Sequence, residues 1–282
     1  MLFFACKLAK SLCKTIKYFA FFVKFCFGED IMPRFFVRRN QIENGKISVL
    51  GDDAHHISRS LRMAAGEHIT VCDMQKTEYD CVLTEFLADR VVAEIVSEKK
   101  CDTEPPYIAN IYQALPKGDK LDTVIQKSVE CGAASVTTFN SERCIAKEKG
   151  DEENKLKRRN KIAFEAAKQS GRGILPEVHA TVSFSEMLKR ASEADIKLFC
   201  YEGDDTVPLK TALKSAVANL ALPEGEIPVI SAVIGSEGGF SIAEVDKARE
   251  AGMIPVGLGK RILRTETAAA FILACLCYEL EL

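Results

Sequence analysis

The chain has 282 residues, which is more than one small domain needs and enough to bury a sizeable core. Apolar residues make up 47% and charged residues 28%, the composition of an ordinary globular protein. The formal net charge of −2 excludes a generally basic chain, so any contact with nucleic acid must come from local basic patches.

Cysteine and histidine usage excludes two further classes of protein. The 11 cysteines include no C-x-x-C pair, and the 4 histidines show no ligand spacing with them. We therefore expect neither a metal site nor a disulfide framework. Scattered thiols favour a reducing compartment, so we expect a cytoplasmic protein.

Residues 1–31 differ in composition from the rest of the chain, with seven phenylalanines and five lysines. The lysines recur at helical spacing and predict a basic amphipathic helix that could lie on a membrane surface. Lys24 interrupts the apolar run, so the segment is too short to span a bilayer. We favour another interpretation, in which translation begins at Met32 and the purine-rich codons of Gly28–Asp30 belong to a ribosome-binding site. On this interpretation no stable membrane association is expected.

The region 32–100 reads as a small β-barrel, because short apolar or alternating runs follow one another with turns between them. The expected strands are 34–37, 46–50, 68–73, 79–87 and 90–98. One helix, 52–63, interrupts them, and Asp52 or Asp53 is its expected N-cap. The proline pair in "CDTEPP" marks 101–106 as a linker.

The region 107–282 alternates apolar strands with amphipathic helices, a pattern typical of a parallel sheet covered on both faces. The expected strands are 107–115, 135–139, 195–203, 227–235 and 253–259. The expected helices are 117–132, 152–169, 183–194 and 241–252, with an uncharged run at 268–278. The sequence therefore predicts an α/β domain after the barrel.

Three junctions between a strand and a loop, at 198–203, 234–240 and 258–268, lie at the sheet edge where such folds bind ligands. Their glycines allow a backbone to approach a ligand closely. Each junction alone is better explained as a tight turn, but three at one edge favour a binding site. Neither G-x-G-x-x-G nor G-x-x-x-x-G-K-[ST] occurs, which excludes the two common phosphate cradles. Backbone amides beside Ile262 and Leu263 better suit a flat heterocycle with a short polar tail.

Six motifs make the chain from Met32 to Leu282 resemble the RsmE family of the SPOUT methyltransferases. They are "MPRFFV", "HHISRSLRMAAGE", "QALPKGDKLDTVIQKSVECG", "EAAKQSGRGILPEV", "IGSEGGFS" and "LGKRILRTETA". One departure is Ser236, where the family usually has proline. The resemblance implies that the chain uses S-adenosylmethionine to methylate N3 of a uridine in 16S ribosomal RNA of the small ribosomal subunit. It also implies a PUA-like barrel, a deep trefoil knot at the C-terminus and a homodimer.

The same resemblance implies which residues bind the cofactor. They are Leu198, Phe199, Gly235, Gly238, Leu258, Gly259, Ile262, Leu263, Thr267 and Ala268. Thr267 is expected to cap the last helix, and the carboxylate of Glu266 is expected at the helix's positive end. The uncharged run that follows is expected to be buried, either within the domain or between two subunits.

The chemistry requires a group that stabilises the anion formed when uridine N3 loses its proton. Arg264 is the first candidate. Arg172 is the second and could come from the partner subunit, although a phosphate contact explains it equally well. Glu237 is the one nearby carboxylate considered as a base.

Contacts with RNA are expected from basic side chains on the barrel and on helix 152–169. The candidates are Arg34, Arg38, Arg59, Arg62, Lys155, Arg158 and Arg159. Such contacts to phosphate give affinity without choosing a nucleotide.

Two other functions stay open at this stage. A non-catalytic RNA-binding protein could have kept the fold, although the intact "IGSEGGF" and "LGKRILRTETA" argue against it. Methylation of a ribose 2′-hydroxyl shares the superfamily fold, but the motifs match the uridine-N3 branch.

Overall fold

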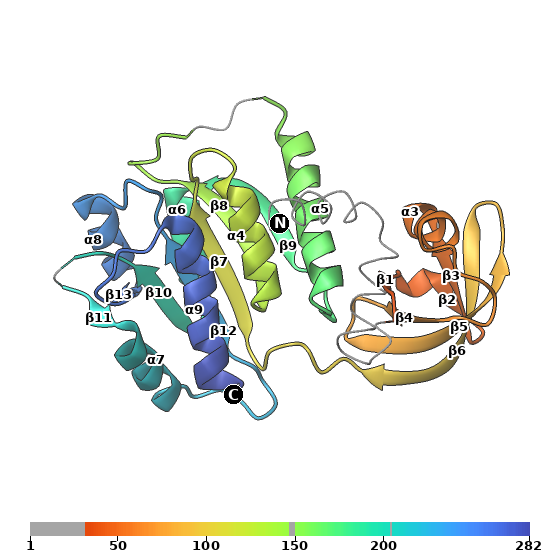
Figure 1. Ribbon diagram of the computed structural model, residues 1–282. Coiled ribbons are helices and arrows are strands. Elements are labelled where there is room, and N and C mark those ends of the chain that lie inside the picture. The colour runs from red at the N-terminus through yellow and green to blue at the C-terminus, as the bar shows by residue number, and fades with distance from the viewer. Residues whose placement is uncertain (1–31, 147–149, 204) are drawn as a thin grey trace, which may run out of the picture. The chain divides into compact units, whose positions relative to one another are not determined.

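The computed structural model describes residues 32–146, 150–203 and 205–282 (Figure 1). The chain divides into two compact units, Met1–Asp102 and Thr103–Leu282, and this division falls within the predicted linker 101–106. The predictions made for residues 1–31 lie outside the described part of the chain.

The N-terminal unit is built on a six-stranded sheet in the order β1-β4-β5-β6-β3-β2. The strands are β1 (Arg34–Phe36), β2 (Ile42–Glu43), β3 (Lys46–Leu50), β4 (His68–Cys72), β5 (Thr77–Phe86) and β6 (Arg90–Lys100). β1 pairs with β4 in parallel and the other pairs are antiparallel. The inward side chains, among them Phe35, Ile69 and Leu83, form one buried cluster. The five strands predicted for the small β-barrel are present, and the two-residue β2 was not predicted.

The helical interruption in this unit begins earlier than predicted. A short helix, α3 (Gly51–His55), continues into a single π-helical segment, η2 (His56–Leu61). The N-cap is Leu50, so the prediction of an aspartate cap is wrong. Asp52 and Asp53 lie instead in the first turn, where the helix dipole also favours a carboxylate.

The C-terminal unit contains a seven-stranded sheet in the order β11-β13-β10-β12-β7-β8-β9, and all of its pairings are parallel. The strands are β7 (Ile108–Ala114), β8 (Ala133–Asn140), β9 (Glu177–Ser183), β10 (Ile196–Cys200), β11 (Val207–Pro208), β12 (Val229–Ile234) and β13 (Ile254–Gly257). The predicted parallel sheet is confirmed. β9 and the two-residue β11 were not predicted from the sequence.

Six helices pack around this sheet (Figure 1). They are α4 (Lys120–Glu130), α5 (Glu152–Gln169), α6 (Phe184–Ala191), α7 (Leu209–Ala218), α8 (Ile242–Glu250) and α9 (Thr265–Leu280). α5 has the predicted bounds because Asp151 caps its first turn and accepts from the backbone amides of Glu153 and Asn154. α7 was not predicted.

The helices divide between the two faces of the sheet. α4 packs against α5, α9 and β8, while α9 also packs against β7 and β12. On the other face, side chains of α6 and α8 join a buried cluster in which Phe199 and Phe240 lie 4.3 Å apart between ring centroids. No helix in the described ranges is long and apolar enough to cross a membrane. The sheet is thus covered on both faces by helices. The loops that follow the carboxyl ends of the strands lie at one end of the sheet.

Candidate functional site

Three segments that are distant in sequence meet at the carboxyl ends of β7 and β12. The side-chain amide of Gln113 donates to the Thr265 hydroxyl at 2.8 Å, and that hydroxyl donates to the carbonyl oxygen of Gly235 at 2.7 Å. Gln113 stands near the end of β7, Gly235 follows β12, and Thr265 begins α9. Neither Gln113 nor Thr265 was predicted as a site residue from the sequence. Their only signal was that both lie inside quoted motifs, "QALPKGDK" and "RTETA".

The loop 258–264 connects β13 to α9 and contains most of the candidate cofactor residues. Gly259 has a φ of +110°, a conformation that side-chain-bearing residues rarely adopt. The Ile262 side chain is 85% exposed, whereas Leu263 is half-buried. An apolar side chain exposed at this edge of the sheet is available to cover a ligand.

The start of α9 differs from the prediction. Its N-cap is Arg264, and Thr267 lies exposed in the first turn, so the prediction that Thr267 caps the helix is wrong. Ala268 is buried. The Arg264 side chain is 82% exposed, with Nη1 3.9 Å from the Glu266 carboxylate, which lies in the first turn as predicted. The guanidinium of Arg264 is therefore open to a ligand.

Leu198 and Phe199 cannot line a pocket with their side chains. Both side chains are fully buried. Their backbones are enclosed within the sheet, because β10 pairs with β12 on one side and β13 on the other. The prediction that they form part of the cofactor pocket is wrong, and they belong to the core beneath the loops.

The glycines after β12 serve two different purposes. A Cβ atom on Gly238 would lie 2.8 Å from the carbonyl oxygen of Arg143, so this glycine admits the protein's own chain rather than a ligand. Gly239 has a φ of +64° and closes the turn. Ser241 then caps α8 in a reciprocal capping box with Glu244. Gly235 remains a cofactor candidate, whereas Gly238 is a packing position.

Glu237 is already engaged by other groups. Its carboxylate accepts from the backbone amide of Lys117 and from the Lys120 ammonium group, at 2.6 Å for the latter. Partial burial raises the pKa of Glu237, but the Lys120 hydrogen bond and the backbone amides outweigh it and hold the pKa below its usual value. A carboxylate of lowered pKa is a poor acceptor for the proton of uridine N3, so the structure does not support the predicted role as a base.

Arg172 is a structural residue. Its side chain is 3% exposed and forms a bidentate ion pair with Glu104. Nη1 donates to the carbonyl oxygens of Val129 and Ala133 at 2.8 and 2.9 Å. Because these donors point at the protein itself, the structure contradicts both the catalytic role and the phosphate contact.

The basic residues predicted to contact RNA differ in how exposed they are. Arg34 is largely buried and pairs with Glu78, and Arg159 is buried on α5, so neither is placed to contact phosphate. Arg38, Arg59 and Arg62 are exposed on the N-terminal unit. On α5, Lys155 is half-buried, and the exposed Arg158 pairs with Asp122.

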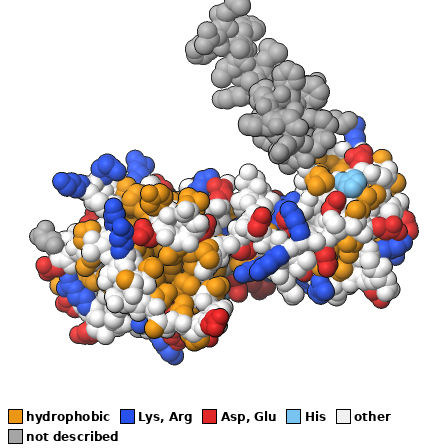
Figure 2. Space-filling view, turned by 90° about the horizontal axis from the view of Figure 1, so that it is seen from below, with side chains coloured by type: hydrophobic (Ala, Val, Ile, Leu, Met, Phe, Trp, Pro, Cys, Tyr) orange, Lys and Arg blue, Asp and Glu red, His pale blue; other side chains and the backbone are white. Residues whose placement is uncertain are grey.

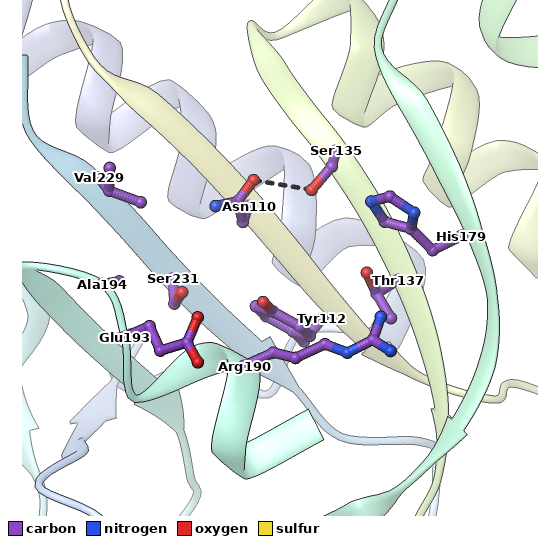
Figure 3. A pocket seen from close by; sticks show the side chains of 10 residues that line it. All are labelled: Asn110, Tyr112, Ser135, Thr137, His179, Arg190, Glu193, Ala194, Val229 and Ser231. Carbon is purple, nitrogen blue, oxygen red and sulfur yellow. Dashed lines mark hydrogen bonds between the residues drawn. The ribbon is translucent and has the colours of Figure 1, made fainter. Parts of the chain in front are cut away.

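A separate hollow of about 420 Å³ lies on the face of the sheet next to α6 (Figure 3). Its lining is mostly polar and comes from β7, β8, β9 and β12 and from α6 with the turn that follows it. The lining residues are Asn110, Tyr112, Ser135, Thr137, His179, Arg190, Glu193, Ala194, Val229 and Ser231. Figure 3 shows Asn110 and Ser135 joined by a hydrogen bond, 2.7 Å long. Because it lies away from the loops described above, this hollow is not the predicted cofactor site.

No group of three or more histidine, cysteine, aspartate or glutamate side chains among the described residues is arranged to hold a metal ion. The site consists instead of loop backbone, apolar side chains and an exposed guanidinium.

Comparison with known proteins relates both units to RNA methyltransferases. Residues 103–277 match an RNA methyltransferase domain, and residues 49–96 match an RNA methyltransferase PUA domain. The chain is 36% identical over 256 residues to Ribosomal RNA small subunit methyltransferase E of Bacillus subtilis, covering 89% of this chain and 98% of the relative.

Solved structures extend this similarity to the fold. One is a Ribosomal RNA small subunit methyltransferase E from Neisseria gonorrhoeae bound to S-adenosyl methionine, with a TM-score of 0.74 and 31% identity. Another is a putative methyltransferase from Legionella pneumophila in complex with the same cofactor, with a TM-score of 0.74 and 26% identity. Each comparison covers 88% of this chain and 98% of the other.

Proposed function

The chain belongs to the family of RNA methyltransferases that includes the Ribosomal RNA small subunit methyltransferase E proteins, and on this premise we propose that it methylates N3 of a uridine in 16S ribosomal RNA. The observation that carries the proposal is the match over both units, 49–96 and 103–277. A methyltransferase domain joined to a PUA domain of RNA methyltransferases suits an enzyme that acts on RNA.

S-adenosylmethionine is the cofactor, and the loops at the carboxyl ends of β12 and β13 fit it. Its adenosine requires apolar contact and backbone hydrogen-bonding groups, which Gly235 and the segment 258–263 offer. When bound, the cofactor supplies a methyl group activated by a sulfonium. The exposed Ile262 and the half-buried Leu263 would be covered by it.

Arg264 acts on the nucleobase. Uridine N3 carries a proton at neutral pH, and attack on a methyl group requires the anion. An exposed guanidinium beside the cofactor loop favours that anion electrostatically, and its donors can bind the uracil oxygens. Since Glu237 is held by Lys117 and Lys120, the residue assigned to the chemistry is Arg264 alone.

Recognition of RNA uses exposed basic side chains. Arg38, Arg59 and Arg62 of the N-terminal unit and Arg158 of α5 would bind phosphate groups, with the half-buried Lys155 beside them. The target uridine would have to leave its stack to reach the cofactor. Ribosomal subunits are assembled in the cytoplasm, and the proposed function places the protein there.

A homodimer is also proposed, with α9 in the interface. Outside its ends, α9 is apolar on all sides, and Tyr278 is 75% exposed. Figure 2 shows apolar side chains gathered on one face of the C-terminal unit. Since large apolar patches on a protein surface commonly mark interfaces, light scattering on the purified protein should give twice the chain mass.

We also propose that the C-terminal unit is tied in a trefoil knot. β13 lies beyond β10, yet α9, which follows it, packs against β12 and β7 and contacts α4. The chain therefore crosses back over two strands after β13. A crystal structure of the protein, traced through 235–265, tests whether this crossing passes through a loop.

The function is tested with small ribosomal subunits from a strain that lacks this gene, supplied with methyl-labelled S-adenosylmethionine. Transfer of label to 16S ribosomal RNA is the expected result. A protein that binds the subunits but transfers nothing under any assembly condition would instead be a non-catalytic RNA-binding protein.

A further inference from the structure

We propose that Gln113 and Thr265 form a positioning pair that sets the affinity of the protein for its cofactor. The pair holds the start of α9 against the ends of β7 and β12, and so fixes one end of the loop 258–264. This inference rests on the function proposed above, because it concerns the same cofactor.

The hydrogen bonds of the pair are closely determined. Gln113 is fully buried, and its Nε2 donates to Thr265 Oγ1 at 2.8 Å and to the carbonyl oxygen of Ala114 at 2.9 Å. The carbonyl oxygen of Gly235 lies 3.3 Å from the same nitrogen. Two carbonyl oxygens around one end of the amide require the NH2 group there, so the orientation of the amide is fixed.

Thr265 completes the arrangement. Its hydroxyl accepts from Gln113 and donates to Gly235, and the side chain is buried. One hydroxyl thus joins β7, the loop after β12 and the first residue of α9.

The Gln113–Thr265 pair stabilises this part of the core less than an apolar pair of the same shape would. Among the described residues, Gln113 Oε1 is buried without a hydrogen-bond partner. A buried acceptor without a partner destabilises the folded state, and apolar side chains of the same shape would avoid that penalty. Because the pair joins three separate segments through hydrogen bonds, it indicates a geometric requirement beyond stability.

The requirement is the geometry of the cofactor loop. Upstream, the loop is anchored where β13 pairs with β10 through Val256 and Cys200. Downstream, it is anchored at Thr265. Between these points lie Gly259, with its positive φ, and the exposed Ile262. If the downstream anchor is released, binding must first order the loop, so cofactor affinity falls.

The experiment compares Thr265→Val, which keeps the shape but loses the hydroxyl, with Thr265→Ser, which keeps the hydroxyl. Calorimetric titration of the full chain with S-adenosylmethionine should show binding about tenfold weaker for Thr265→Val and within about twofold of wild type for Thr265→Ser. At saturating cofactor, the loss of kcat in Thr265→Val should be smaller than its loss of affinity, because bound cofactor orders the loop again.

A second variant, Gln113→Leu, tests the pair as a unit. Because either change breaks the same link, Gln113→Leu combined with Thr265→Val should bind the cofactor no more weakly than the worse single variant. The single variant Gln113→Leu also removes the unpartnered Oε1 atom. It can therefore be titrated with the cofactor even if Thr265→Val does not fold.

Two results would overturn the inference in different ways. Wild-type affinity in Thr265→Val or Gln113→Leu, even with a lowered Tm, would make the pair purely structural and leave the proposed function intact. A wild-type protein that does not bind S-adenosylmethionine would overturn the proposed function and this inference together.

Discussion

The guanidinium of Arg172 donates to both carboxylate oxygens of Glu104, with Nε–Oε1 and Nη2–Oε2 distances of 2.9 Å. Glu104 also accepts from the backbone amides of Gly173 and Ile174. Burial raises the pKa of Glu104, but the Arg172 ion pair and these amides outweigh it and hold the pKa below its usual value. Arg172, whose flanking glycines suggest a ligand contact, is therefore part of the core.

Replacing Glu104 with glutamine should lower the free energy of unfolding by about 3–5 kcal/mol, since it leaves the Arg172 charge buried without a counter-charge. Urea denaturation at neutral pH measures this. The matched control is Glu177→Gln, because Glu177 is exposed on β9, and its unfolding should be unchanged. Equal effects of the two changes would contradict the structural assignment.

The same pair predicts a dependence of stability on pH. Because the pKa of Glu104 is lower in the folded than in the unfolded protein, its contribution is complete above the ordinary glutamate pKa of about 4.3. The contribution is lost as the pH falls through the lowered pKa. The difference in unfolding free energy between wild type and Glu104→Gln should thus shrink below that value. A difference that grew with acidification would have the wrong sign.

Arg264→Ala should abolish detectable methyl transfer, with a loss of at least about 10²–10³-fold in kcat, while the oligomeric state stays unchanged. The control is Arg249→Ala, an exposed arginine on α8 that pairs with Asp246. Initial rates with saturating cofactor and small subunits measure the effect. Near-normal turnover in Arg264→Ala would remove this residue from the mechanism.

The sequence was sufficient for elements whose signals are local. The bounds of α5 follow from Asp151 at the N-cap, and the alternation of apolar strands and amphipathic helices is a local pattern. It missed β9, "EVHATVS", although Val178, Ala180 and Val182 alternate there with polar residues. It also missed α7, whose N-terminus has no side-chain cap. A seven-residue alternation and an uncapped helix are weak signals without the packing that stabilises such elements.

The position of the candidate loops in the fold was predictable from the sequence, but their contacts were not. The segments 235–240 and 258–263 were expected after strands at one edge of the sheet, and they follow β12 and β13. Whether Arg172 faces solvent or Glu104 depends on a contact between residues 68 positions apart, which no local pattern shows. The same holds for Glu237 and Lys120, and for Gln113 and Thr265.

Glu237→Gln should leave turnover within about tenfold of wild type, because general base catalysis would contribute about 10²–10⁴-fold. The amide can still accept from the Lys117 backbone amide, although it loses the ion pair with Lys120. The pH dependence of kcat in wild type and Glu237→Gln shows whether Glu237 acts as a general base. A loss of a hundredfold or more with a changed pH profile would restore Glu237 as a base.

Leu263→Asp should weaken binding of S-adenosylmethionine, since it places an unpaired charge where the adenosine requires apolar contact. Leu263→Met keeps an apolar side chain of similar size and should bind as the wild type does. Calorimetry with both variants compares them directly. Unchanged affinity in Leu263→Asp would place the adenosine elsewhere.

The central claim is tested most directly by identifying the methylated nucleoside. Small ribosomal subunits from a strain lacking this gene are incubated with the protein and labelled S-adenosylmethionine, and the RNA is digested and analysed by mass spectrometry. Label in 3-methyluridine is the predicted result, and it should vanish with Arg264→Ala. Label in a 2′-O-methyl nucleoside would keep the cofactor and the fold but contradict the proposed chemistry.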